Sequence, residues 1–226
     1  MRIAVLELPA SYGAPDRVLD VIDARIAAQP ADLFVTPEAA LHGYVSPDGD
    51  FDISRFAEGL TGPTATRAAA IAAKHRCHLV TSLVLREGDA LYNAMTCHGP
   101  DGLAFVYRKR HPWIPETWAT PGPRVAPVVS IAGVRVTIAV CYDLHFLDDD
   151  LQPADVLLFP SAWVERPDSR RVRLQRLAAK RGIAIANANW APGDVRVWGQ
   201  GNSCIARPDG SLETVAAPNG RLDLDV

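Results

Sequence analysis

The chain has 226 residues, of which 48% are hydrophobic and 22% charged, and its formal net charge is -3 at pH 7. Such a composition is typical of a globular protein with one sizeable core, and a weakly acidic chain offers no basis for binding nucleic acid or an anionic membrane. No apolar run is long enough to span a bilayer, and the first one meets Glu7 before it could serve as a secretory signal. We therefore expect a cytoplasmic protein whose cysteines are reduced thiols.

The first part of the chain alternates strand and helix patterns. Short apolar runs predict strands over residues 3–8, 32–36 and 79–85, and apolar residues at helical spacing predict helices over residues 15–29 and 63–75. A strand, a helix and a second strand in succession predict a right-handed crossover and a parallel strand pair.

The rest of the chain adds hairpins to this pattern. Turn residues between apolar runs predict two β-hairpins, and further buried strands flank one basic helix. These elements are a hairpin of residues 92–98 and 103–107, strands over 134–140, 155–163 and 182–190, a helix over 170–181, and a hairpin of residues 203–207 and 212–215. Because no linker or repeat interrupts the pattern, we expect residues 1–226 to form a single α/β domain with a mixed sheet.

Three reactive side chains follow predicted strands. Glu38 comes just after the strand over residues 32–36, Lys109 ends the first hairpin, and Cys141 ends the strand over residues 134–140. Proteins of the α/β class place ligand-binding groups at such strand ends. Each residue also has a simpler interpretation: Glu38 could be a solvated helix-start carboxylate, Lys109 part of a solvated basic face, and Cys141 a small core hydrophobe.

A thiol, a carboxylate and an ammonium together form a set that can cleave an amide. The thiolate of Cys141 would be the nucleophile, and it needs a base because a free thiol is mostly protonated at neutral pH. Glu38 could take that proton if burial raises its pKa towards neutrality. Lys109 and the backbone N–H of Tyr142 could stabilise the oxyanion that develops on the carbonyl.

At these positions the sequence resembles the nitrilase superfamily, the carbon–nitrogen hydrolases. Three segments match in the family's order, namely residues 34–38 with Gly43 and Tyr44 behind them, residues 107–111, and residues 140–146. They are similar to the segments that carry the family's catalytic Glu, Lys and Cys. Later blocks extend the resemblance over nearly the whole chain, at residues 158–163, 186–189 and 201–203.

The resemblance implies a four-layer αββα sandwich of mixed sheets, a small-molecule amide as substrate, a homodimer, and no cofactor or metal. It implies that Cys141 attacks the carbonyl, that Glu38 transfers protons, and that Lys109 holds the oxyanion while a thioester forms. Glu116 falls where the family often has a second Glu that positions the reacting groups. An N-carbamoyl-amine and a nitrile are the alternative substrates.

The resemblance also implies a substrate-binding set of Tyr44, Tyr142 and Trp163, although Trp163 could equally well pack in the core. The sequence departs from the family's pattern in several places. His145 stands where the family usually has Arg, the segment 177–182 lacks the usual acid, and the chain stops soon after its last hairpin. These departures leave the substrate and the subunit interface open.

Three other interpretations compete with this one. A papain-like pair of Cys141 and His145 is disfavoured, because those enzymes place the thiol at a helix N-terminus with a distant histidine. A metal site built from Cys141, Asp143, His145 and the acidic residues 148–150 lacks a recognised ligand spacing. An inactive family member that acts as a binding subunit is disfavoured by the intact reactive set.

Overall fold

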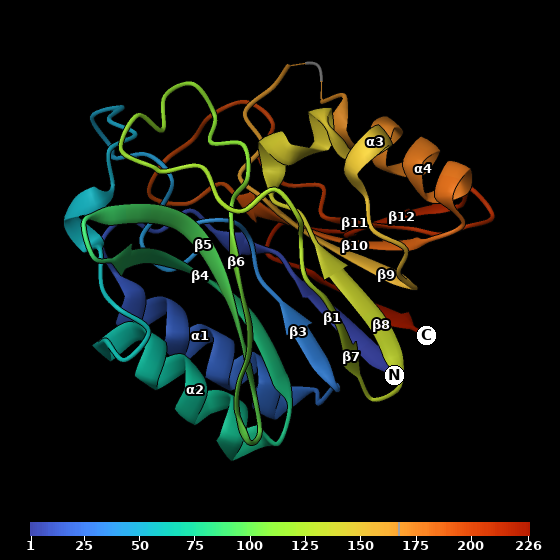
Figure 1. The fold of residues 1–226 in the computed structure, drawn as a ribbon, viewed down its shortest axis with the longest axis horizontal. Helices are drawn as coiled ribbons and strands as arrows, with labels where there is room; N and C mark the ends of the chain where they lie inside the picture. Colours follow the sequence, from blue (N-terminus) through green and yellow to red (C-terminus); the bar gives the residue numbers. More distant parts are fainter. Residues whose placement is uncertain (167) are drawn as a thin grey trace.

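The computed structural model describes residues 1–166 and 168–226, and the side chains of Asp149 and Asp150, part of the acidic cluster considered above, lie outside the described residues. Two β-sheets pack face to face, and helices cover the outer face of each sheet (Figure 1). The expected four-layer αββα sandwich with mixed sheets is therefore confirmed.

The first sheet has a parallel centre with antiparallel edges. In order across the sheet, its strands are β13 (Arg221–Asp225), β1 (Arg2–Leu6), β3 (Leu33–Val35), β4 (His78–Glu87), β5 (Ala90–Gly99) and β6 (Gly102–Arg108). β1, β3 and β4 run parallel, as the strand–helix–strand pattern predicted, and the other neighbours are antiparallel.

The second sheet repeats this arrangement. In order across the sheet, its strands are β12 (Leu212–Thr214), β11 (Cys204–Ala206), β10 (Ala184–Ala191), β9 (Val156–Ser161), β8 (Val134–Ile138) and β7 (Val128–Ile131), and β2 (Leu8–Pro9) pairs with the end of β10. β8, β9 and β10 are parallel, and both predicted hairpins are present.

The predicted helices form the two outer layers. α1 (Pro15–Ala28) and α2 (Pro63–His75) cover the first sheet, and α4 (Arg170–Arg181) covers the second (Figure 1). Both helices of the first sheet begin with a proline, whose fixed φ suits the first helical position. The shorter helical segments are a 3₁₀ turn at Ser54–Phe56, a 3₁₀ turn at Cys141–His145, and α3 (Leu147–Asp150).

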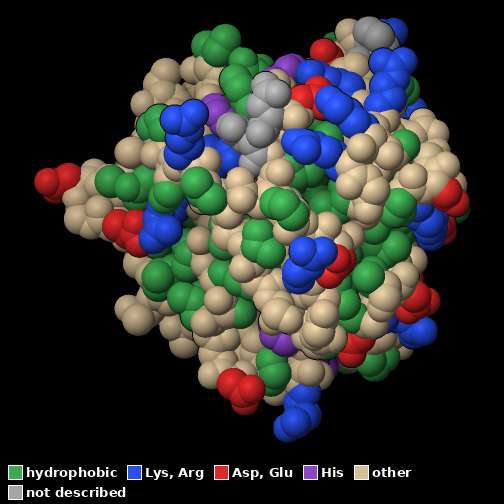
Figure 2. All heavy atoms as spheres, turned by 45° about the vertical axis from the view of Figure 1, so that its right-hand side comes forward, with side chains coloured by type: hydrophobic (Ala, Val, Ile, Leu, Met, Phe, Trp, Pro, Cys, Tyr) green, Lys and Arg blue, Asp and Glu red, His purple; other side chains and the backbone are tan. Residues whose placement is uncertain are grey.

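The outer side of α4 is strongly basic. Arg173, Arg176 and Lys180 leave the helix away from the sheet, and Lys and Arg side chains gather across the upper part of the face shown in Figure 2. Among the described helices, none combines the length and the apolar character needed to cross a membrane.

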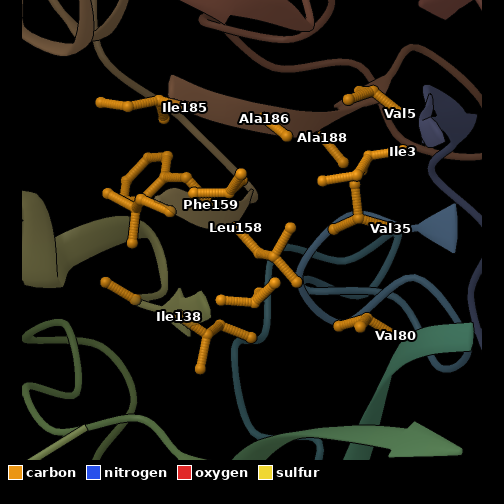
Figure 3. Close-up of a cluster of buried hydrophobic side chains, with 14 of the residues drawn as sticks. Ile3, Val5, Val35, Val80, Ile138, Leu158, Phe159, Ile185, Ala186 and Ala188 are labelled. Carbon is orange, nitrogen blue, oxygen red and sulfur yellow. The ribbon is translucent and has the colours of Figure 1, made fainter. Parts of the chain in front are cut away.

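Strand alternation divides the core into an inner and an outer layer. In β1, Ile3 and Val5 point towards the second sheet, whereas Ala4 and Leu6 pack under the helices of the first sheet. The inner side chains meet Leu158 and other apolar residues of the second sheet (Figure 3). This apolar contact holds the two sheets together, and it fixes where their strand ends lie relative to each other.

The strand predicted over residues 3–8 is divided between the two sheets. β1 ends at Leu6, β2 begins at Leu8, and Glu7 lies between them, fully buried. The Glu7 carboxylate accepts hydrogen bonds from the N–H and hydroxyl of Ser203, both at 2.8 Å, and from the N–H of Asn219 at 3.1 Å. The prediction of one continuous strand was therefore wrong. The chain passes from the first sheet to the second at Glu7, and the polar partners of the buried carboxylate hold this residue in place.

Two further strands were not predicted from the sequence. β13 pairs antiparallel with β1 at the edge of the first sheet, and β7 pairs with β8 at the edge of the second. Leu222 and Leu224 are buried while their neighbours in β13 are more exposed, so this strand does carry a short period-two pattern. Edge strands of this length give only a weak sequence signal.

Candidate active site

The candidate site lies where strand ends of the two sheets meet. In the first sheet, Glu38 follows β3 and Lys109 follows β6; in the second, Cys141 follows β8 and Ala162 follows β9. The N–H of Ala162 donates to Glu38 Oε2 at 2.9 Å, which joins the two sheets at this point. The fold therefore brings together side chains that are far apart in the sequence.

A buried ion cluster forms the centre of the site. Lys109 Nζ donates to Glu38 Oε1 at 2.7 Å and to both carboxylate oxygens of Glu116 at 2.9 Å. The side chains of Lys109 and Glu38 are 0% exposed, and that of Glu116 is 1% exposed. Because a buried charge is tolerated only when it is paired, these contacts fix all three side chains in place.

Asn93 is a member of the cluster that the sequence analysis did not identify. Its Nδ2 donates to Glu38 Oε1 and to Glu116 Oε1, both at 2.8 Å, so one amide group bridges the two carboxylates. Its backbone carbonyl accepts from the N–H of Lys109 at 2.8 Å. Asn93 lies inside β5, and an asparagine within a strand pattern carries no signal of this role in the sequence.

The basic residues on either side of Lys109 behave differently from each other. Arg108 points outward and pairs with Glu87, as expected from strand alternation. Arg110, which the same alternation places on the outer side, is instead buried, because β6 ends at Arg108 and the chain turns after it. The simpler interpretation of Lys109 as part of a solvated basic face is wrong.

Cys141 opens the 3₁₀ turn that follows β8. Its φ is 47°, in the left-handed region that a non-glycine residue adopts only at some cost. The first N–H groups of a helical turn have no partner within the turn, and the N–H of Tyr142 is in this position. The turn thus presents a thiol and an adjacent N–H donor at the end of the strand.

Asp143 holds this turn against the segment that carries Lys109. Its Oδ2 accepts from the hydroxyl of Tyr107 at 2.6 Å and from the N–H of Val140 at 2.9 Å. Its Oδ1 accepts from the N–H of His111 at 2.9 Å and lies 2.8 Å from His111 Nδ1. Asp143 is fully buried, and these contacts show a positioning role that the sequence analysis did not assign.

Burial and charge shift the pKa of each reactive group. Burial raises the pKa of the Glu38 carboxyl and the charge of Glu116 raises it further, although Lys109 pulls it down. The pKa of the Cys141 thiol is well above its usual range, through burial first and the Glu38 charge second. Burial alone would lower the pKa of Lys109, but Glu38 and Glu116 raise it, so the lysine stays charged.

Location, and not acidity, distinguishes Cys141 from the other thiols. Burial raises the pKa of Cys77 and Cys204 to about 11 and that of Cys97 to about 12. All four cysteines are free thiols, as expected. Cys141 differs because its thiol lies close enough to Glu38 and Lys109 for their charges to act on it, and because it lines a cavity.

A cavity of about 370 Å³ opens beside Cys141. The three residues expected to bind substrate, Tyr44, Tyr142 and Trp163, all line it, and Trp163 is also buried in the packing around it. The described residues that line the cavity are Tyr44, Trp113, Cys141, Tyr142, His145, Ala162, Trp163, Val164 and Glu165.

The alternative roles of Cys141 and Asp143 find no support in this geometry. His145 is exposed, and one of its ring nitrogens lies 3.2 Å from Nη1 of Arg173, whereas the charges that act on the Cys141 thiol are those of Glu38 and Lys109. The carboxylate of Asp143 points inward to Tyr107 and the 107–111 segment. Among the described side chains, no group of three His, Cys, Asp or Glu is arranged to hold a metal ion.

Comparison with known proteins identifies the family. A family profile described as carbon-nitrogen hydrolase matches residues 4–222. The chain therefore belongs to the carbon-nitrogen hydrolase family, and its resemblance to the nitrilase superfamily is confirmed.

Relatives and solved structures agree with this assignment. The chain is 30% identical to a hydrolase encoded in the pqqF 5' region of Pseudomonas protegens, over 92% of this chain and 78% of that protein. It is 32% identical to an (R)-stereoselective amidase of a Pseudomonas species, over 64% of this chain and 53% of that protein. An amidase structure from Nesterenkonia sp. matches with a TM-score of 0.86 at 28% identity, over 100% of this chain and 90% of that chain.

One further structure bears on the thiol. In a mutant of the amidase from Nesterenkonia sp. AN1, acrylamide has added to the active-site cysteine. That structure matches this chain with a TM-score of 0.86 at 27% identity, over 100% of this chain and 93% of the other.

The contacts of Asp143 predict that it controls the reactivity of Cys141. Asp143→Ala should slow the alkylation of Cys141 by iodoacetamide by roughly 10²-fold, because a misplacement of about 1 Å is enough for such a loss. The rate would be followed by mass spectrometry of the Cys141 peptide, with circular dichroism to confirm folding. Asp155→Ala is the matched control, since Asp155 lies before β9 and pairs with Arg135 at the surface. Equal alkylation rates in both variants would contradict the role of Asp143.

Proposed function

We propose that the protein hydrolyses the carbon–nitrogen bond of a small amide through a thioester on Cys141. The observation that carries this proposal is the position of the Cys141 thiol at the wall of a cavity, close enough to the buried Glu38–Lys109 pair for both charges to act on its pKa. The amidase relatives and the acrylamide adduct on a related active-site cysteine support it.

Acylation begins with proton transfer from the thiol to Glu38. Because the pKa of the thiol is raised, Cys141 is protonated at neutral pH, and the carboxylate must accept the proton as the Sγ–carbon bond forms. The pKa of Glu38 is itself raised, which makes this carboxylate a stronger base than a solvated one. The same proton then passes to the leaving nitrogen as the carbon–nitrogen bond breaks, which releases ammonia or an amine.

The oxyanion has two donors in reach of the thiol. The N–H of Tyr142 follows the nucleophile directly, and a preorganised backbone donor stabilises charge where it develops. Lys109 Nζ carries three protons. In this structure it donates to both carboxylate oxygens of Glu116 as well as to Glu38. One of these protons can turn to the oxyanion while Lys109 keeps its bond to Glu38.

Hydrolysis of the thioester reuses the same base. Water takes the place of the amine, gives a proton to Glu38, and attacks the acyl carbon; the carbon–sulfur bond then breaks and the proton returns to the thiolate. The product is a carboxylic acid. Asn93 and Glu116 hold Glu38 and Lys109 in place through both steps, because Asn93 donates to the carboxylates of Glu38 and Glu116, and Glu116 accepts from Lys109.

The acyl-enzyme is the first test of this proposal. Wild-type protein mixed with a panel of small amides, ureido acids and nitriles should hydrolyse an amide, and rapid acid quenching should trap the acyl group on Cys141 in the mass spectrum. Cys141→Ala should lose both the adduct and the turnover while it keeps the fold, because only one thiol is removed. An adduct on Cys77, Cys97 or Cys204 would refute the assignment.

The pH dependence tests the role of Glu38. The active form carries an ionised Glu38, so the rate should be lost as pH falls through its pKa, which burial places above the usual value of 4.5. Glu116→Gln removes a charge that raises this pKa, so the acidic limb should move to lower pH in that variant. The profile of kcat/KM is the measurement, and an acidic limb at or below 4.5 in the wild type would contradict the assignment.

A further inference from the structure

We infer that the cavity selects amides whose acyl group is uncharged and apolar, and that an aryl group is preferred. This inference rests on the proposed function, because it concerns the substrate of the same site. It is carried by the side chains that line the cavity beside Cys141.

Stacked rings form much of the cavity lining. The ring centroids of Tyr44 and Trp113 lie 6.3 Å apart with planes inclined by 22°, and those of His145 and Trp163 lie 6.2 Å apart with planes inclined by 6°. The first pair comes from the loops after β3 and β6, and the second from the segments after β8 and β9. A flat apolar group between these loops would meet ring faces and edges from both sheets, and such contacts add to the gain from burial.

The size of the cavity favours an acyl group larger than acetyl. Its volume of about 370 Å³ lies at the small end of the range of roughly 300–1,000 Å³ found for small-molecule sites. A two-carbon acyl group would leave most of this space to water against apolar walls. An arylalkyl group would displace that water and bury apolar surface, which is the favourable exchange.

The charges around the cavity disfavour a carboxylate on the acyl group. Among the described residues that line it, none is Lys or Arg, and Glu165 stands at the exposed rim. Behind the thiol, two carboxylates share the single ammonium of Lys109. Arg173 lies against His145 from the side of α4 and lines a neighbouring hollow, and it is not among the residues that line the cavity.

A panel of matched amides tests this inference. Phenylacetamide against acetamide measures the contribution of the ring, and pentanamide against glutaramate replaces an apolar end by a carboxylate of similar size. We expect kcat/KM to be at least about tenfold higher for phenylacetamide than for acetamide, since small apolar differences in a hydrophobic pocket are worth roughly 10–200-fold. We expect glutaramate to be the poorest substrate of the four.

Trp163→Ala tests whether the indole of Trp163 limits the size of the acyl group that the cavity accepts. The variant should lose kcat/KM for phenylacetamide and gain it for 1-naphthylacetamide, because the space left by the indole admits a second ring. Trp198→Ala is the matched control, since Trp198 is 63% exposed and is not among the cavity residues. Trp113→Ala, in the other stacked pair, should show the same shift and covers the case in which Trp163→Ala fails to fold.

The outcomes separate this inference from the proposed function. Equal kcat/KM for phenylacetamide and acetamide, or a preference for glutaramate over pentanamide, would overturn the acyl selectivity while amide hydrolysis stands. A complete absence of amide hydrolysis and of a Cys141 adduct would overturn both.

Discussion

The pairing of one buried ammonium with two buried carboxylates is the constraint on which this site depends. Lys109, Glu38 and Glu116 are almost inaccessible to water, so each charge relies on the others and on Asn93. Removing one partner from a buried ionic group typically costs about 3–5 kcal/mol, because a charge is left uncompensated. The ends of β3 and β6, the middle of β5 and the loop of Glu116 must therefore come together whenever the first sheet forms.

The thiol is supplied by the other sheet, and a few contacts align it with this cluster. The N–H of Ala162 donates to Glu38, and Asp143 ties the turn of Cys141 to Tyr107 in the first sheet. The apolar layer between the sheets fixes how the two sheets pack, and these polar contacts fix the position of the thiol relative to the buried charges. This division explains how a thiol with a raised pKa can act, since the Glu38 carboxylate that can take its proton lies beside it and its charge acts on the thiol.

The sequence predicts those parts of the fold that rest on local pattern. The main helices, the parallel strand pair of the first sheet and the hairpins follow from local pattern, and Glu38, Lys109 and Cys141 stand out because they follow strands. Asn93 and Asp143 were missed because their roles arise from pairings between distant segments. Two predictions failed for a related reason. Glu7 was placed inside one strand although the chain changes sheet there, and Arg110 was placed on the outer side of a strand that ends before it. Neither event alters the local sequence pattern.

The central claim is that Glu38 transfers protons in both halves of the reaction. Glu38→Gln keeps the size of the side chain but removes its basicity, so rapid-quench kinetics with phenylacetamide should resolve slower thioester formation and slower thioester hydrolysis. General acid–base catalysis typically contributes roughly 10²–10⁴-fold, and we expect losses of that order in each step. Wild-type rates for both steps in the glutamine variant would show that Glu38 is only a structural carboxylate, and the account would fail.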